Sequence, residues 1–126
     1  HRRVPNTHLV MHGSSSVPQD LQDIVHQYGG NIKQTGGVPV EEIQEGIRNG
    51  VRKINVDTDN RLAVTGAIRK AFADKPHEFD PRYYNTLGRD AMKKVVKERM
   101  IQFGQAGHAQ KIRQVTLAEM AKVYLS

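Results

Sequence analysis

The pattern of apolar and polar positions changes period several times along the chain. Residues 7–11 form a short apolar run, as in a buried strand, and residues 51–56 are predicted to form a second strand. Apolar residues spaced three and four positions apart predict helices over 16–28 and 39–49, and a third helix that begins near Asp59. The order strand, helix, helix, strand, helix is typical of an α/β fold with a parallel sheet and right-handed crossovers.

Beyond Pro76 the pattern becomes purely helical. A long helix is predicted over residues 86–103, and a short one over residues 117–124 begins at a capping box of Thr116 and Glu119. The predicted core side of the long helix consists of Met92, Val95, Val96, Met100 and Phe103. We therefore predict two βα units in residues 1–75 and a helical extension of the same domain in residues 76–126.

Capping residues mark the predicted starts of two earlier helices. Ser16 with Gln19 forms a second potential capping box, around Pro18. Asp57 and Asp59 precede the helix that follows the second strand, and the expected role of Asp59 is helix capping.

Two parallel strands do not make a stable sheet. Parallel sheets are buried on both faces, and two strands alone leave two unpaired edges. We therefore expect the chain to be the C-terminal part of a larger (β/α)8 TIM barrel, contributing its last two βα units. The first residue, His1, is not a methionine, which agrees with that expectation. A complete small α/β domain is the alternative.

Composition narrows the function classes. The 126 residues include no cysteine, which excludes disulfides, thiolate metal sites and a cysteine nucleophile. No apolar run reaches the roughly 18 residues of a membrane span. The net charge of +6 is concentrated in residues 89–126, where eight basic and three acidic side chains leave +5. We interpret this tail, which includes Arg99, as a solvated helix face; the alternative is a non-enzymatic anion- or nucleic-acid-binding module.

Polar residues follow both predicted strands. The first strand ends in His12-Gly13-Ser14-Ser15-Ser16 and the second in Asn55-Val56-Asp57-Thr58-Asp59. In α/β barrels the active site lies at the carboxyl ends of the strands, and the last two loops often hold a phosphate. A glycine lets an anion approach the backbone, and hydroxyls and helix N-terminal N–H groups donate to it. Each loop alone could equally be an ordinary capped connection.

The sequence leaves the chemical roles of His12, of the two aspartates and of Arg82 undecided. His12 is a candidate metal ligand or acid/base, although a catalytic zinc takes three protein ligands and the chain shows one. Asp57 and Asp59 could be paired catalytic carboxylates. Arg82 follows Pro81 in a predicted turn and could clamp a phosphate or lie on the surface.

Three segments resemble one family closely. They are PNTHLVMHGSSSVP (5–18), GVPVEEIQEGIRNGVRKINVDTDNRLA (37–63) and FDPRYY (79–84). They resemble the C-terminal third of the class II, metal-dependent fructose-1,6-bisphosphate aldolases, best the branch often called Calvin-cycle type. The resemblance implies reversible cleavage of fructose 1,6-bisphosphate to dihydroxyacetone phosphate and glyceraldehyde 3-phosphate, in glycolysis, gluconeogenesis or the Calvin cycle.

The resemblance also implies cofactors and partners. Zinc or another divalent ion is expected, and a monovalent cation is a further candidate. The protein is expected to be a cytoplasmic dimer or tetramer that binds neither nucleic acid nor membranes. The general acid/base aspartate and another zinc-binding histidine of the family lie upstream of the matched segments, so residues 1–126 alone are expected to be inactive.

Residue roles follow from the matched motifs. By resemblance, His12 is the last zinc ligand, and Gly13 and Ser15 hold the phosphate of dihydroxyacetone phosphate, with Ser14 at a variable position. Asn55 is the catalytic residue near the enediolate.

The remaining matches concern the substrate. By resemblance, Asp57 and Thr58 bind phosphate and hydroxyls, and Arg82 reaches the far phosphate from a neighbouring subunit. Asp57 stands where tagatose-1,6-bisphosphate aldolases tend to have alanine, which favours the fructose substrate over that alternative.

Overall fold

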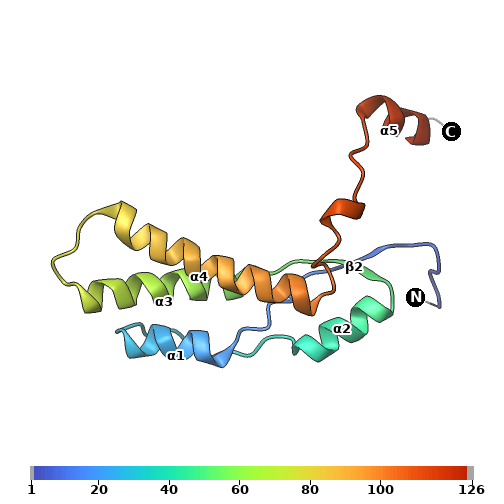
Figure 1. The fold of residues 1–126 in the computed structure, drawn as a ribbon. Helices are drawn as coiled ribbons and strands as arrows, with labels where there is room; N and C mark the ends of the chain where they lie inside the picture. The colour runs from blue at the N-terminus through green and yellow to red at the C-terminus, as the bar shows by residue number, and fades with distance from the viewer. Residues whose placement is uncertain (1, 125–126) are drawn as a thin grey trace.

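A two-stranded parallel sheet is joined to a layer of helices in the computed structural model, which describes residues 2–124 (Figure 1). The elements, in chain order, are β1 (Leu9–Met11), α1 (Gln19–Gln27), α2 (Val40–Arg48), β2 (Val51–Ile54), α3 (Thr58–Asp74), α4 (Pro81–Gln102), the 3-10 helix η1 (Ala109–Lys111) and α5 (Leu117–Tyr124). The predicted order of strands and helices is confirmed, and so is the parallel pairing.

The strands are shorter than predicted. They contain three and four residues, with Leu9 opposite Val51 and Met11 opposite Ile54. The predicted continuation of the second strand to residue 56 is wrong. β1 ends at Met11, whose carbonyl accepts from Asn55 N, and Asp57 N then donates to the Ser15 side chain in the loop after β1 instead of extending the ladder.

Helix α2 covers the sheet from one side. It begins after Pro39, as predicted, and Ile43 on its inner face is fully buried. The helix ends at Arg48 with Asn49 as its C-cap, and Gly50, with φ of +103°, reverses the chain directly into β2. Glycine suits this turn because it alone adopts such φ values without steric cost.

Helix α3 lies between α1 and α4 (Figure 1). Small residues allow these close approaches. A Cβ at Gly66 of α3 would lie 2.9 Å from Ile24 of α1, and a Cβ at Gly88 of α4 would lie 3.3 Å from Val64 of α3. The buried apolar residues of this layer are Val25, Ala63, Ala71 and Val95.

Helix α4 differs from its prediction in start and in orientation. It begins at Pro81, five residues before the expected position, because the Asp80 carboxylate caps it by accepting from the Arg82 backbone N–H at 2.9 Å. Arg82 therefore lies in the first turn of a helix. Of the five predicted core residues only Val95 is buried.

The face of α4 that packs against α3 explains this difference. Gly88, Val95 and Arg99 are its buried residues, so the face that packs at Gly88 is rotated from the predicted one and shares only Val95 with it. Met92, Val96 and Met100 are 39–45% exposed as a result.

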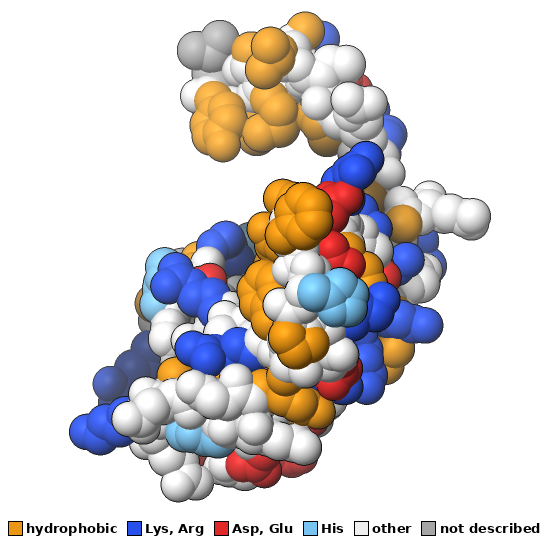
Figure 2. Space-filling model, turned by 90° about the vertical axis from the view of Figure 1, so that its left-hand side faces the viewer, with side chains coloured by type: hydrophobic (Ala, Val, Ile, Leu, Met, Phe, Trp, Pro, Cys, Tyr) orange, Lys and Arg blue, Asp and Glu red, His pale blue; other side chains and the backbone are white. Residues whose placement is uncertain are grey.

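The C-terminal helix α5 stands apart from the helical layer (Figures 1 and 2). The predicted capping box is confirmed, because Thr116 N donates to Glu119 Oε2 at 2.8 Å and Glu119 N donates to Thr116 Oγ1. Leu117 and Tyr124 are 90% and 81% exposed. The division of the chain at residue 75 stays a prediction. Within residues 2–124, no helix combines the length and apolar character that crossing a membrane requires.

Burial of Ile43 predicts a stability effect. The substitution Ile43→Ala leaves a cavity at a fully buried site, so the free energy of unfolding of the protein that contains this segment should fall by about 2–5 kcal/mol in urea titrations followed by circular dichroism. Ile101→Ala is the matched control, because Ile101 is 59% exposed and its loss should cost less than about 1 kcal/mol. Equal losses would contradict the assignment of Ile43 to the core.

Candidate functional site

The loops after β1 and β2 lie side by side, because the two strands are parallel neighbours. Asn55 joins them: its backbone N–H and its side-chain Nδ2 both donate to the Met11 carbonyl at 3.0 Å. Lys53 Nζ donates to Asn55 Oδ1 at 2.5 Å, which fixes the orientation of the amide. Asn55 is thereby held beside the residue that precedes His12.

A second link joins Ser15 to the start of α3. The Ser15 Oγ accepts hydrogen bonds from the backbone N–H groups of Asp57 and Thr58, each at 3.0 Å. No side chain of α3 caps its own N-terminus, so the hydroxyl from the other loop satisfies these donors. Two N–H groups at the positive end of a 17-residue helix converge on one oxygen, which is an arrangement that can hold an anion.

Gly13 and Ser14 complete the first loop in different ways. Gly13 is exposed and has φ of +63°, a conformation that favours glycine. Ser14 is fully buried, and within residues 2–124 its Oγ has no hydrogen-bond partner. The predicted binding roles of both residues stay predictions.

His12 is exposed at the end of β1. Among residues 2–124 no three His, Cys, Asp or Glu side chains lie close enough together to hold a metal ion. A catalytic zinc takes three protein ligands, so the described residues do not form a metal site by themselves. His12 could supply one ligand to a site completed by other residues.

Asp57 and Asp59 are not paired carboxylates, and that possibility is wrong. Asp57 is exposed and forms a salt bridge with Arg61 at 2.8 Å, in which both side chains are more than two-thirds exposed. Such a pair contributes little to stability. Asp59, by contrast, is fully buried.

Asp59 does not cap α3 as predicted; it binds the loop after β1. Its Oδ1 accepts from Val17 N at 2.8 Å, and its Oδ2 accepts from Ser16 N and Ser16 Oγ at 3.3 and 3.1 Å. Arg99 of α4 donates to the same Oδ2 from Nε at 3.1 Å and from Nη2 at 2.9 Å. Interpreting Arg99 as part of a solvated basic face is therefore wrong: it is 9% exposed.

The predicted capping box of Ser16 and Gln19 is also wrong. The N-cap of α1 is Pro18, with no side-chain cap bond, because the Ser16 hydroxyl is engaged by Asp59. Gln19 bonds instead to Asp23 on its own helix.

Sequence reasoning missed two residues that support this loop. Gln22 is 1% exposed and bonds to both backbone groups of Thr35 and to the Val17 carbonyl. Arg99 lies four residues after Val95, on the face of α4 that carries Gly88. The one sequence feature that could have indicated a buried Arg99 is its position within a stripe of small and apolar residues.

Arg82 is the one predicted site residue that the structure separates from the others. It lies beyond the far end of α3, and a 17-residue helix is about 25 Å long. Its side chain is 92% exposed and paired with Asp80. The hydrogen bonds from the Arg82 side chain and backbone N–H hold the pKa of Asp80 below its ordinary value.

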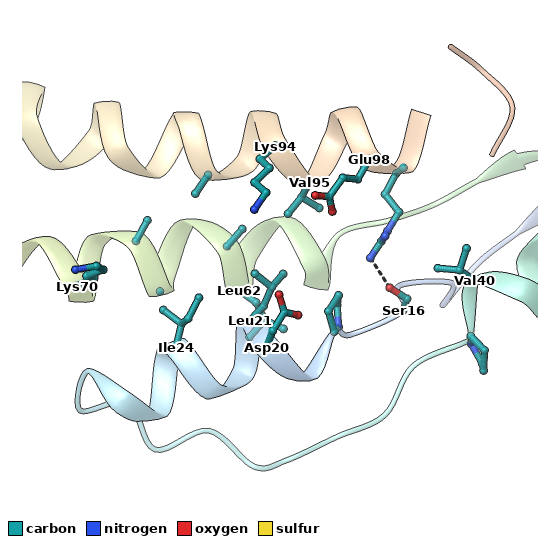
Figure 3. A pocket seen from close by; sticks show the side chains of 17 residues that line it. Ser16, Asp20, Leu21, Ile24, Val40, Leu62, Lys70, Lys94, Val95 and Glu98 are labelled. Carbon is teal, nitrogen blue, oxygen red and sulfur yellow. Dashed lines mark hydrogen bonds between the residues drawn. The ribbon is translucent and has the colours of Figure 1, made fainter. Parts of the chain in front are cut away.

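A cavity of about 610 Å³ lies between α1, α3 and α4 (Figure 3). Leu21, Ile24, Leu62 and Val95 line its apolar part, and the hydrogen bond between Arg99 and Ser16 lies at one end (Figure 3). The cavity thus adjoins the support of the first loop and not the exposed His12.

The family model of fructose-bisphosphate aldolase class-II matches residues 1–108. The chain belongs to this aldolase family. It is 61% identical to the fructose-bisphosphate aldolase of Nostoc commune over 124 residues. This matched region covers 98% of this chain and 34% of the relative. It is 60% identical over 126 residues to the fructose-bisphosphate aldolase of Xanthobacter flavus, covering all of this chain and 36% of that relative.

A third relative, the fructose-bisphosphate aldolase class 2 of Synechocystis, is 56% identical over 124 residues, which are 98% of this chain and 34% of that relative. The chain spans about a third of the length of the curated relatives that it matches. The resemblance found in the three motifs is therefore confirmed.

Gly37 provides a test of the loop geometry in this aldolase segment. A Cβ at Gly37 would lie 2.1 Å from Ser15 O and 2.6 Å from Ser16 C, and these backbone atoms cannot turn aside. Gly37→Ala should therefore displace the Ser15 loop and lower the free energy of unfolding by about 1–3 kcal/mol, measured by thermal unfolding. Gly36→Ala is the control, since its Cβ meets nothing within 4 Å. Indistinguishable unfolding of the two variants would show that the loop is not held as described.

Proposed function

We propose that residues 1–126 supply part of the active site of a class II aldolase that reversibly cleaves fructose 1,6-bisphosphate into dihydroxyacetone phosphate and glyceraldehyde 3-phosphate. The observation that carries the proposal is the convergence of Ser15 Oγ with the N–H groups of Asp57 and Thr58, in a chain that belongs to this family. We also propose that β1 and β2 are the last two strands of a (β/α)8 barrel.

The Ser15 loop and the start of α3 would bind one phosphate of the substrate. A phosphate oxygen placed where the Ser15 Oγ now accepts would receive the N–H groups of Asp57 and Thr58 and the positive end of the helix. The serine hydroxyl would then rotate and donate to the same phosphate. The exposed backbone at Gly13 would border this group.

Asn55 would stabilise the charge that develops as the carbon–carbon bond breaks. Its Nδ2 carries two hydrogens, so one can remain on the Met11 carbonyl while the other donates to the developing oxyanion. The Lys53 ammonium on Oδ1 polarises the amide in the same sense.

His12 would be one ligand of a divalent metal ion whose other protein ligands come from outside residues 1–126. When bound, a zinc ion supplies Lewis acidity toward a ketone oxygen. The general acid/base would likewise come from outside this segment.

Arg82 would act at the site of a second copy of the protein. Its separation from the loops by the length of α3 prevents it from reaching the site of its own chain, whereas its 92% exposed side chain is free to enter a neighbouring one. This assignment implies a homo-oligomer. Family membership supports a cytoplasmic location and a role in glycolysis, gluconeogenesis or the Calvin cycle.

Activity is testable in a hybrid enzyme, in which residues 1–126 replace the segment of the Xanthobacter flavus aldolase that they match. We expect cleavage of fructose 1,6-bisphosphate. Ser15→Ala should raise KM about 10- to 100-fold, as expected for the loss of one hydrogen bond to a charged group. Thr65→Ala, at an exposed position on α3, should leave KM unchanged. An inactive hybrid, or one that prefers tagatose 1,6-bisphosphate, would contradict the proposal.

Metal binding gives a separate prediction. In the hybrid, His12→Ala should bind zinc at least about tenfold more weakly, because it removes a ligand, and His26→Ala, on the surface of α1, should not. Zinc content after dialysis, measured by atomic emission, checks this. Residues 1–126 alone should show negligible turnover. Full zinc occupancy of His12→Ala, or turnover by the isolated chain, would refute the assignment.

A further inference from the structure

The buried Asp59 carboxylate connects three parts of the chain. Asp59 accepts five hydrogen bonds from segments distant in sequence. Val17 N, Ser16 N and Ser16 Oγ donate from the loop after β1, and Nε and Nη2 of Arg99 donate from α4. The Ser16 hydroxyl donates to Asp59 and accepts from Arg99 Nη2 at 2.5 Å. A carboxylate without solvent contact requires such partners, since an unpaired buried charge is costly.

The loop held by Asp59 contains a strained residue. Val17 has φ of +50° and is the one non-glycine residue of 2–124 with a positive φ. A β-branched residue keeps this conformation only when its surroundings impose it. The Asp59 Oδ1 holds the Val17 N–H at 2.8 Å, and Gln22 Nε2 holds the Val17 carbonyl at 3.2 Å.

The Ser16–Asp59 contact lies next to the proposed anion-binding contact in both loops. Ser15 Oγ contacts Thr58 N, and the next residue of each loop forms the Ser16–Asp59 contact. These two contacts and the intervening peptide bonds close a small ring. A shift of Asp59 relative to Ser16 therefore moves Ser15 Oγ relative to the N–H of Thr58.

We infer that Asp59 and Arg99 are a positioning pair that sets the affinity of the Ser15 loop for the substrate phosphate. This inference rests on the proposed aldolase function. Arg99 reaches the loop from α4, 83 residues away from Ser16, so the C-terminal extension orders a binding loop of the α/β part. Its Nη1 donates to Gln102 Oε1 at 2.6 Å, so all three guanidinium nitrogens are engaged within the protein. Arg99 thus acts through Asp59 and Ser16 and not by contact with substrate.

The pair is testable in the hybrid enzyme with the double variant Asp59→Asn/Arg99→Gln, which removes both charges and leaves no unpaired buried ion. We expect KM for fructose 1,6-bisphosphate to rise about tenfold or more, as for the loss of a charge-assisted hydrogen bond, while kcat falls less than about threefold. The inhibition constant of inorganic phosphate should rise by the same factor as KM, because phosphate alone probes the loop.

Controls separate positioning from stability. Arg89→Gln, an exposed position on the same helix, should change neither constant. Arg99→Lys keeps the charge and should restore part of the affinity. If the double variant does not fold, Ser16→Ala, which keeps the ion pair and removes only the bridging hydroxyl, should still raise both constants by a smaller factor.

Two results would overturn the inference: variants that unfold at lower temperature with KM and the phosphate inhibition constant unchanged, or variants that lose kcat with KM unchanged. Inactivity of the unsubstituted hybrid would instead overturn the proposed function. The two failures are thereby distinguishable.

Discussion

The ion pair between Asp59 and Arg99 is the interaction on which the arrangement of the two strand-end loops depends. Asp59 is fully buried, and Arg99 is the charged partner that makes this burial tolerable. Because Asp59 also binds the backbone of Ser16 and Val17, the same pair fixes the path of the loop after β1. An electrostatic requirement inside the helical layer is therefore coupled to the geometry of the loop that carries Ser15.

The proposed phosphate site does not depend on the net charge of the chain. The groups that converge there are backbone N–H groups and a hydroxyl, not lysines or arginines. The strongly basic C-terminal segment contributes one of its arginines to an internal ion pair with Asp59. One of the positive charges of this segment therefore stabilises the fold, which weakens the interpretation of the segment as a polyanion-binding surface.

The helices set the distances between functional parts. α3 begins at the Thr58 N–H and carries the chain away from the site, and Arg82 follows beyond its far end. The close contact of α4 with α3 at Gly88 then returns the chain, so that Arg99 reaches the loop again near the start of α3. One helical hairpin therefore places one arginine at a distance from the site and another directly behind it.

Local patterns in the sequence determined the order of the elements, the capping box at Thr116, the start of α2 after Pro39 and the two polar loops with His12, Ser15 and Asn55 at the strand ends. These features depend on residues within a few positions of one another, and short motifs also carried the family resemblance. Only the tertiary structure decided the burial of Asp59 and Arg99 and the face of α4 that packs inward. The burial of Asp59 and Arg99 depends on partners 40 or more residues away, and the inward face of α4 depends on the close approach of Gly88 to Val64 in another helix. No local period or capping preference encodes such contacts.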